Sequence, residues 1–257
     1  GFQFTHPVPV EAEIGRYYET PDYISHSDTH KGLMNRVYHW VRRVMLARKA
    51  RLVKHNSRLS QGSLLDIGTG TGYFPHFMQE RGWHVSAIEK SPQARQFAKE
   101  HFELDVAAPE ALNEFADKSF DVITLWHVME HLEHLNETWE TLKRILKDQG
   151  ILIIAVPNPT SFDAEKYKEM WGAYDVPRHL WHFSPSVMQQ FGAKHDFILC
   201  ERHPMPFDAF YVSMLSEKYR KSAFPFIKGL ITGSEAWIVS LAKKDRSSSM
   251  IYVFRKK

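Results

Sequence analysis

Cysteine is almost absent: Cys200 is the single one among 257 residues. One thiol cannot form an internal disulfide framework, so the fold must rest on a hydrophobic core. A chain of this length can bury such a core in one large domain, or in one domain with additions. A single cysteine also fits a reducing compartment.

Long hydrophobic runs and a dense basic block are missing too. No stretch of about 18 apolar residues and no signal peptide is found, so we expect a cytoplasmic protein without a membrane span. The formal net charge is only +3, and beyond Arg42–Arg43 and Arg48–Arg51 no cluster of cations suggests nucleic-acid binding. The sequence does not indicate an oligomeric state.

A glycine-rich stretch, Leu64–Gly72, is the strongest local pattern. An apolar run ends there in glycines at alternate positions, and residues 73–81 can form a helix. This order predicts a buried strand that breaks into a tight loop and then opens a helix. The glycines allow a sharp turn and a close approach of a ligand, and free N–H groups of the loop can bind polar ligand atoms.

The spacing of the glycines excludes two nucleotide-binding loops. A dinucleotide fingerprint requires a third glycine where Tyr73 stands, and a phosphate-binding P-loop requires a Gly-Lys-Ser/Thr that is missing. The remaining pattern is acidic-x-Gly-x-Gly-x-Gly. Asp66 ends the strand, where its carboxylate can bind a cationic amine.

This pattern resembles the first motif of the class I S-adenosylmethionine-dependent methyltransferases. The resemblance implies that S-adenosylmethionine is the cofactor and that the loop binds it. The implied cofactor-binding residues of this stretch are Asp66, Gly68, Thr69, Gly70, Gly72 and Tyr73.

A second acid follows the next predicted strand, 84–89. Glu89 lies about 20 residues beyond the glycines, where a carboxylate at the tip of the neighbouring strand can accept both ribose hydroxyls. Lys90 is adjacent and is predicted to join the cofactor site. Ser91 and Pro92 then form the N-cap and first position of another helix.

The adenine contact stays open. Residues 102–106 are a plausible third strand, and in similar methyltransferases an acid just after it binds the adenine amino group. Here Ala108 occupies that position, with Asp105 and Glu110 on either side.

Phe120–Trp126 predicts a buried strand, and together with His127–His131 it resembles the fourth motif of the same class. The resemblance implies that Trp126 and His127 flank the cofactor. Strands that alternate with helices form a mostly parallel sheet, whose ligands bind outside the carboxyl ends of the strands. Asp66, Glu89 and Trp126 all fall on that edge.

The predicted fold class is therefore α/β, Rossmann-like and doubly wound, with a seven-stranded, mostly parallel sheet. The last strand, 249–254, is expected to run antiparallel at the edge of the sheet. Residues 1–60 are expected to form a helical extension, with helices at 11–19 and 31–55. Residues 61–257 then form the methyltransferase domain, with a helical insertion at about 205–243.

A histidine cluster follows the fourth motif. His127, Glu130 and His131 share a face if the segment is helical. Two similar subgroups, the ubiquinone-pathway O-methyltransferases and the small-RNA 2′-O-methyltransferases, carry Glu-x-x-Glu-His here and hold a divalent cation. In this chain His127 replaces the first glutamate. Because imidazole favours a softer metal or none, no metal ligand is predicted, and His127 is interpreted as an acid, a base or an orienting group.

The loop 171–185 is rich in aromatic residues and resembles a Pro-x-His-x-x-x-Phe-Ser segment of the group labelled methyltransferase domain 23. His179 and His182 lie in it and can act together with His127, or they can simply pack among the aromatic rings. The predicted catalytic residues are His127, His131, His179 and His182.

The first residues, 1–9, resemble the tail of a zinc ribbon that precedes this domain in some relatives, so we expect a metal-binding head to be missing from this sequence. The predicted helix 31–55 is expected to pack on the sheet, and the aromatic residues before it are interpreted, compatibly with this, as a lid over the cofactor. The predicted lid residues are Tyr17, Tyr18, Tyr23 and His26.

The predicted function is methyl transfer to an oxygen, nitrogen or carbon of a small, apolar or aromatic acceptor. Two alternatives stay open. One is a catalytically silent module that only binds the cofactor, and the other is an NAD-type Rossmann protein, against which Tyr73 argues.

Overall fold

The structure is a computed structural model, and it describes residues 2–9, 13, 17 and 33–257. The predicted lid residues Tyr18, Tyr23 and His26 and most of the predicted helix 11–19 lie outside the described residues. The predicted helix 31–55 is confirmed as α3, Leu33–Ser57.

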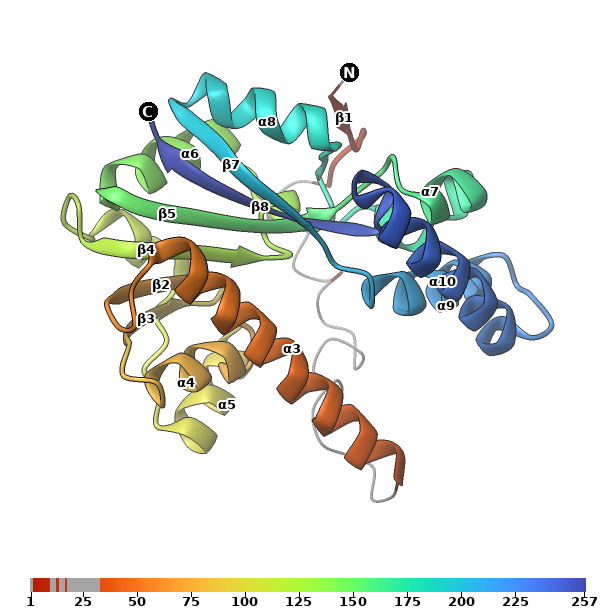
Figure 1. Cartoon of the computed structure of the whole chain (residues 1–257), viewed down its shortest axis with the longest axis horizontal. Coiled ribbons are helices and arrows are strands. Elements are labelled where there is room, and N and C mark those ends of the chain that lie inside the picture. Colours follow the sequence, from red (N-terminus) through yellow and green to blue (C-terminus); the bar gives the residue numbers. More distant parts are fainter. Residues whose placement is uncertain (1, 10–12, 14–16, 18–32) are drawn as a thin grey trace.

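A six-stranded sheet forms the centre of the molecule, in the order β3-β2-β4-β5-β8-β7 (Figure 1). The pairs β3·β2, β2·β4 and β4·β5 are parallel, whereas β8 runs antiparallel to both of its neighbours. The α/β class and the antiparallel last strand are thus confirmed. The strands are β2 (Ser63–Ile67), β3 (His84–Ile88), β4 (Phe120–Trp126), β5 (Leu146–Pro157), β7 (Phe197–Pro204) and β8 (Ser249–Lys256).

Two details of the predicted sheet are wrong. The strand expected at 102–106 does not form, because Phe102 still belongs to helix α5 and Glu103 ends that helix with a left-handed φ of 54°. A single bridge between Ile88 and Ala107 remains, so the sheet has six strands instead of seven.

The last strand also lies inside the sheet, not at its edge. β8 is buried on both faces over Tyr252–Phe254, whereas burial alternates along β7, which forms the edge beside it. An edge strand of an antiparallel pair can leave one face to solvent, which gives alternating burial. Continuous burial along a strand requires that other elements cover both of its faces.

Helices cover both faces of the sheet, as the doubly wound prediction requires (Figure 1). On one face, Ala50 and Val53 of α3 pack with Phe74 and Met78 of α4. On the other face, Trp139 of α6 has no exposed surface and contacts the rings of three phenylalanines. The helices around the sheet are α4 (Tyr73–Gln79), α5 (Pro92–Phe102), α6 (Leu135–Ile145), α7 (Phe162–Tyr167) and α8 (Pro185–Lys194).

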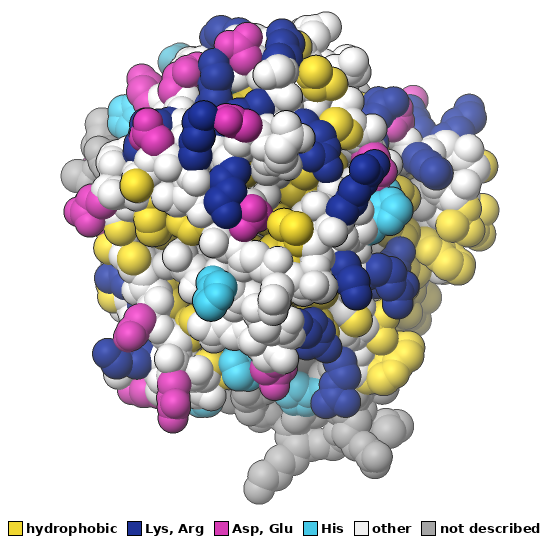
Figure 2. All heavy atoms as spheres, turned by 60° about the vertical axis from the view of Figure 1, so that its left-hand side comes forward, with side chains coloured by type: hydrophobic (Ala, Val, Ile, Leu, Met, Phe, Trp, Pro, Cys, Tyr) yellow, Lys and Arg dark blue, Asp and Glu magenta, His cyan; other side chains and the backbone are white. Residues whose placement is uncertain are grey.

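The predicted insertion is a pair of packed helices, α9 (Asp208–Tyr219) and α10 (Pro225–Ala242), which lie beside α7 in Figure 1. A separate two-stranded sheet joins β1 (Gln3–Phe4) to β6 (Trp181–His182). Among the described residues, no helix is long and apolar enough to cross a membrane. Figure 2 shows lysine and arginine side chains interspersed with acidic ones on one face of the molecule.

Candidate functional site

The glycine loop and the acid after β3 are in direct contact. Glu89 is 4% exposed, and its Oε2 accepts a hydrogen bond of 2.8 Å from the N–H of Gly70. Its Oε1 accepts from the N–H of Ser91 at 2.9 Å, and the N–H of Gly68 donates to the carbonyl of Ile88 at 2.8 Å. The carboxylate of Glu89 therefore ties the loop after β2 to the end of β3.

Two glycines of the loop differ in what surrounds them. Gly68 has φ +68°, and a Cβ on it would lie 2.3 Å from Cγ2 of Val128. Gly70 has φ +57°, and a Cβ there would meet no atom within 4 Å. Packing therefore requires Gly68, whereas Gly70 borders open space against which a ligand can lie.

Asp66 is a buried carboxylate at the end of β2. It is 2% exposed, and its Oδ1 accepts a hydrogen bond of 2.5 Å from the hydroxyl of Thr124. Burial raises the pKa of Asp66 to about 6, although this hydrogen bond and the nearby ammonium of Lys49 act in the opposite direction. At neutral pH the site thus holds a carboxylate in a dry environment, where attraction to a cation is strong.

Lys49 of α3 belongs to the site although sequence reasoning missed it. Its Nζ lies 4.4 Å from the ring centre of Trp126. Burial lowers the pKa of Lys49, while attraction to Asp66 and Asp208 raises it. The available signal was that Lys49 stands one helical turn before Val53, an apolar position of the inward face.

Trp126 lies where it was predicted, at the carboxyl end of β4. Its ring is buried against Phe74 at a centroid distance of 5.6 Å, and its Nε1 has no hydrogen-bond partner among the described residues. Buried donors normally have a hydrogen-bond partner, so this Nε1–H is available to donate to an acceptor atom of a bound ligand.

Three other predicted cofactor residues lie near the loop with different surroundings. Tyr73 begins α4 and packs on Phe102 at a ring distance of 4.9 Å. Ala108 follows Ala107, whose carbonyl accepts the backbone N–H of Glu89 at 3.0 Å. The side chain of Lys90 is 66% exposed, and its nearest acid is Glu133 at 3.9 Å.

His127 lies between two carboxylates. Its Nε2 is 3.1 Å from Oδ2 of Asp208, and its Nδ1 is 3.5 Å from Oε1 of Glu130. Burial alone would lower the pKa of His127, but the two carboxylates outweigh it and raise the pKa to about 10. His127 is therefore an imidazolium at neutral pH. Asp208 was missed as a site residue, because an acid in the first turn of a helix is normally read as a helix-terminal charge.

Glu130, His131 and His179 form a buried cluster whose ligating atoms all lie within 4.8 Å of one another. Glu130 is 1% exposed, and neither of its oxygens has a hydrogen-bond partner among the described residues. Burial tends to raise the pKa of Glu130, but His127 and the neighbouring histidines more than offset it and the pKa is lowered. The carboxylate is therefore ionised.

The two histidines of this cluster are oriented by backbone carbonyls. Nδ1 of His131 lies 3.0 Å from the carbonyl of Arg178, and Nδ1 of His179 lies 2.9 Å from that of Ala173. Since a carbonyl only accepts, each Nδ1 carries a proton and each Nε2 is the ring atom left to face a metal, although Nε2 of His179 also lies 3.6 Å from Oδ2 of Asp175. One carboxylate and two imidazoles whose ligating atoms lie this close together form a donor set that fits a metal ion.

His182 lies outside this cluster. Its Nε2 is 3.2 Å from the hydroxyl of Thr5, and burial lowers its pKa. It lines a cavity of about 600 Å³ together with Tyr174 and Val176. The structure thus brings three of the four predicted histidines together around Glu130 and places the fourth in a separate hollow.

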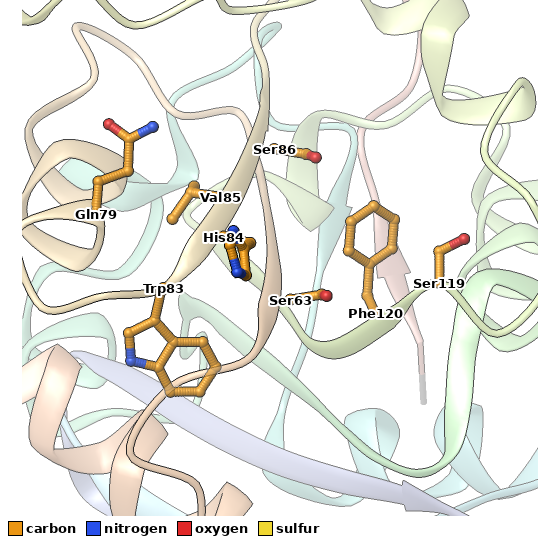
Figure 3. A pocket seen from close by; sticks show the side chains of 8 residues that line it. All are labelled: Ser63, Gln79, Trp83, His84, Val85, Ser86, Ser119 and Phe120. Carbon is orange, nitrogen blue, oxygen red and sulfur yellow. The ribbon is translucent and has the colours of Figure 1, made fainter.

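Two further cavities differ in their relation to the sheet. A hollow of about 340 Å³ lies at the amino ends of the strands, lined by Ser63, His84 and Ser119 among others, and is shown in Figure 3. Ligands of parallel sheets bind at the opposite edge, so we assign no function to it. A cavity of about 290 Å³ beside Lys49 has a mostly apolar lining that includes Met205.

Comparison with known proteins agrees with this geometry. A family model described as a methyltransferase domain matches residues 37–200. The chain is 33% identical over 112 residues to an uncharacterized methyltransferase of Staphylococcus carnosus, which covers 43% of this chain and 53% of that protein. It is 27% identical over 134 residues to the mitochondrial ubiquinone biosynthesis O-methyltransferase of Schizosaccharomyces pombe, which covers 49% of each.

Among solved structures, the chain is similar to the Burkholderia thailandensis 1,6-didemethyltoxoflavin-N1-methyltransferase, with a TM-score of 0.58 and 12% identity over 100% of this chain and 95% of that one. At this identity the likeness concerns the fold alone. The chain spans about half the length of the curated relatives described above.

Proposed function

Because the chain belongs to the family of methyltransferase domains, we propose that it transfers a methyl group from S-adenosylmethionine to a small-molecule acceptor. The observation that carries this proposal is the joint position of Asp66, Gly70 and Glu89, two acids and a glycine loop at one sheet edge. The names of the relatives support it, since the Schizosaccharomyces pombe protein is called an O-methyltransferase and the Burkholderia thailandensis structure contains S-adenosylhomocysteine.

The residues present fit such a cofactor. S-adenosylmethionine supplies a methyl group on a positively charged sulfur, which an acceptor atom attacks in line. We assign the amino-acid end to Asp66 and the open side of Gly70, and the ribose to Glu89. Trp126 and Ala108 flank the remaining part. The protein mainly aligns the reactants and excludes water.

His127 and His179 face the acceptor in this proposal, whereas His182 lies in a separate hollow. His127 is held as an imidazolium by Asp208 and Glu130, which suits an orienting group better than a base. Burial lowers the pKa of His179 to about 4, and it also lowers the pKa of His182. Both are therefore neutral at pH 7, and so low a pKa makes His179 only a weak base there.

We also propose that Glu130, His131 and His179 hold a divalent cation. The ionised carboxylate without hydrogen bonds and the two oriented imidazoles support this, and a bound cation would polarise an acceptor hydroxyl. A mixed oxygen and nitrogen donor set favours Mn²⁺ or Zn²⁺ over Mg²⁺.

We expect Mn²⁺ to bind the protein in a calorimetric titration, and Glu130→Gln to weaken that binding more than about tenfold because it removes the only anionic ligand. Glu133→Gln is the matched control, because Glu133 lies outside the cluster and its carboxylate contacts Lys90 instead. Equal Mn²⁺ affinity of Glu130→Gln and the wild type would contradict the proposed metal site. His179 would then remain as the candidate proton acceptor.

The test of the whole proposal is calorimetry with S-adenosylhomocysteine and, separately, with NAD. We expect the first to bind and the second to show no heat beyond dilution. No binding of S-adenosylhomocysteine at millimolar concentration contradicts the proposal, and preferred binding of NAD would favour a dinucleotide-binding protein. Binding without turnover on any acceptor would favour a silent cofactor-binding module.

The raised pKa of Asp66 predicts a pH dependence of cofactor binding. Above pH 6 the carboxylate is ionised and attracts the ammonium group of the ligand, so affinity for S-adenosylhomocysteine should fall about tenfold for each pH unit below about 6. Lys49→Met should move this midpoint to higher pH and increase the affinity at pH 8, because the competing ammonium is removed. Lys54→Met, exposed on the same helix, should change neither. A weaker affinity of Lys49→Met at pH 8 would show that Lys49 binds the ligand itself.

The acceptor is proposed to be apolar or aromatic, because apolar side chains such as Met45, Met205 and Ile251 line the cavity beside Lys49, next to several basic ones. A cytoplasmic location belongs to the same proposal. Comparing the small molecules of cells with and without the protein would identify the acceptor by its altered methylation.

A further inference from the structure

Helix α10 has an outer face that is apolar and exposed. Ile227, Ile231 and Ile238 follow one another on this face at helical spacing, and each is more than half exposed. Ser234 is the polar residue in the same arc. We call this set the outer face of α10, and it consists of Phe224, Phe226, Ile227, Leu230, Ile231, Trp237, Ile238 and Leu241.

The inner face of α10 explains why these side chains point outward. Its buried residues are all small, and they allow close contact with α9. A Cβ on Gly229 would lie 2.6 Å from Cα of Met214, and one on Gly233 would lie 2.8 Å from Cα of Phe210. The close contact with α9 is therefore made by small residues, while the most exposed apolar side chains of α10 point away from it, which is the reverse of an ordinary amphipathic helix of a globular protein.

Cations flank the outer face at both ends. Between residues 218 and 244 the sequence has a single acidic residue, Glu235, and its carboxylate is paired with Lys166. The cations of this range are Lys218, Arg220, Lys221, Lys228, Lys243 and Lys244. The outer face of α10 is thus an apolar stripe with cations at both ends. Such a stripe is complementary to a partner surface that has an apolar interior and anionic groups at its outer boundary.

We propose that the outer face of α10 docks on the surface of a bilayer that contains anionic lipids. The helix then lies in the plane of the interface, with its apolar side chains among the acyl chains and its lysines at the phosphates. Trp237 is of the type that is enriched at the membrane–water interface, and Phe224 and Phe226 are typical of the apolar face of such helices.

The charges argue against a second copy of this chain as the occupant. A two-fold contact of the outer face with itself would bring the cations of one copy against those of the other. Anionic lipid headgroups neutralise them instead. Because α9 begins at Asp208, which contacts His127, docking would also bring the candidate site close to membrane-borne apolar molecules; this last consequence rests on the proposed function.

The experiment is sedimentation of the whole chain with vesicles of phosphatidylcholine, with and without about 30 mol% phosphatidylglycerol. We expect the wild type to sediment with the anionic vesicles at low salt and to be released at high salt. The double variant Ile231→Glu, Ile238→Glu should bind more than about tenfold more weakly. In the docked state each of these exposed isoleucines would enter the acyl chains, and the variant places a charge there instead.

Two controls separate docking from damage to the fold. Ile198→Glu, which changes a residue of β7 that is 51% exposed, should bind vesicles like the wild type. Lys243→Glu with Lys244→Glu should weaken binding to anionic vesicles while the melting temperature and the affinity for S-adenosylhomocysteine stay unchanged. This second readout keeps vesicle binding distinct from the proposed cofactor function.

Three results would overturn the proposal. The wild type fails to sediment with anionic vesicles at low salt, or the Ile231→Glu, Ile238→Glu variant sediments as well as the wild type. In the third, light scattering finds that the wild type is a dimer and the Ile231→Glu, Ile238→Glu variant a monomer, while neither form binds vesicles. The outer face would then join two copies of the chain.

Discussion

Replacing Glu89 by alanine is expected to weaken the binding of S-adenosylhomocysteine at least about 100-fold. The carboxylate of Glu89 accepts the N–H groups of Gly70 and Ser91, and in the proposed complex it also accepts the ribose hydroxyls. Hydrogen bonds to a charged group contribute about 1.5–3 kcal/mol each. The loss of the two proposed bonds to the ribose therefore corresponds to a loss of affinity of about 100-fold or more. Calorimetry at pH 7.5 measures it.

Two further variants show how the loss arises. Glu89→Gln keeps one oxygen as an acceptor for Gly70 and should bind with intermediate affinity. Glu100→Ala removes an exposed carboxylate from helix α5, which follows Glu89 in the chain, and should leave the affinity unchanged. An affinity of Glu89→Ala within about threefold of the wild type would contradict the ribose assignment.

The second large effect is expected from a matched pair of glycine variants. Gly68→Ala should lower the free energy of unfolding by about 2–4 kcal/mol, because a left-handed φ costs about 1 kcal/mol and its Cβ collides with Val128. Gly70→Ala has the same backbone cost but no collision, so it should lose only about 1 kcal/mol. Denaturant unfolding measures both.

Cofactor binding should reverse the order of these two variants. Gly70→Ala should bind S-adenosylhomocysteine at least about tenfold more weakly, because its methyl group enters the space that the ligand is proposed to occupy. The collision in Gly68→Ala should be relieved in part by adding Val128→Ala, which removes Cγ2. If Gly70→Ala binds the ligand like the wild type, the open space beside the loop is not the cofactor site.

The strands and helices that repeat a clear pattern were predictable. Phe120–Trp126 forms a strand with those bounds, and Ser91 caps a helix as expected, because both signals act over a few neighbouring residues. The strand expected at 102–106 failed because helix α5 extends to Phe102 and because the following residues find no partner strand before Ala107. Whether a short segment pairs depends on a neighbour's free edge, and here the chain reaches β3 only at Ala107.

The site shows the same division. Asp66, the glycines and Glu89 were readable, because their spacing is set by one strand–loop–helix unit and its neighbour. Lys49 and Asp208 were not, since one belongs to a helix before the first strand of the parallel sheet and the other to an insertion near the end of the chain. Only packing brings both toward Asp66, Trp126 and His127.

The sequence by itself determined the α/β class, the parallel core and the family, because these depend on local periodicity and on the motif around Asp66. The tertiary structure decided the position of β8 inside the sheet, the two carboxylates around His127 and the outward apolar face of α10. Each of these depends on which distant segment lies alongside, and that is settled by burial and charge across the whole fold.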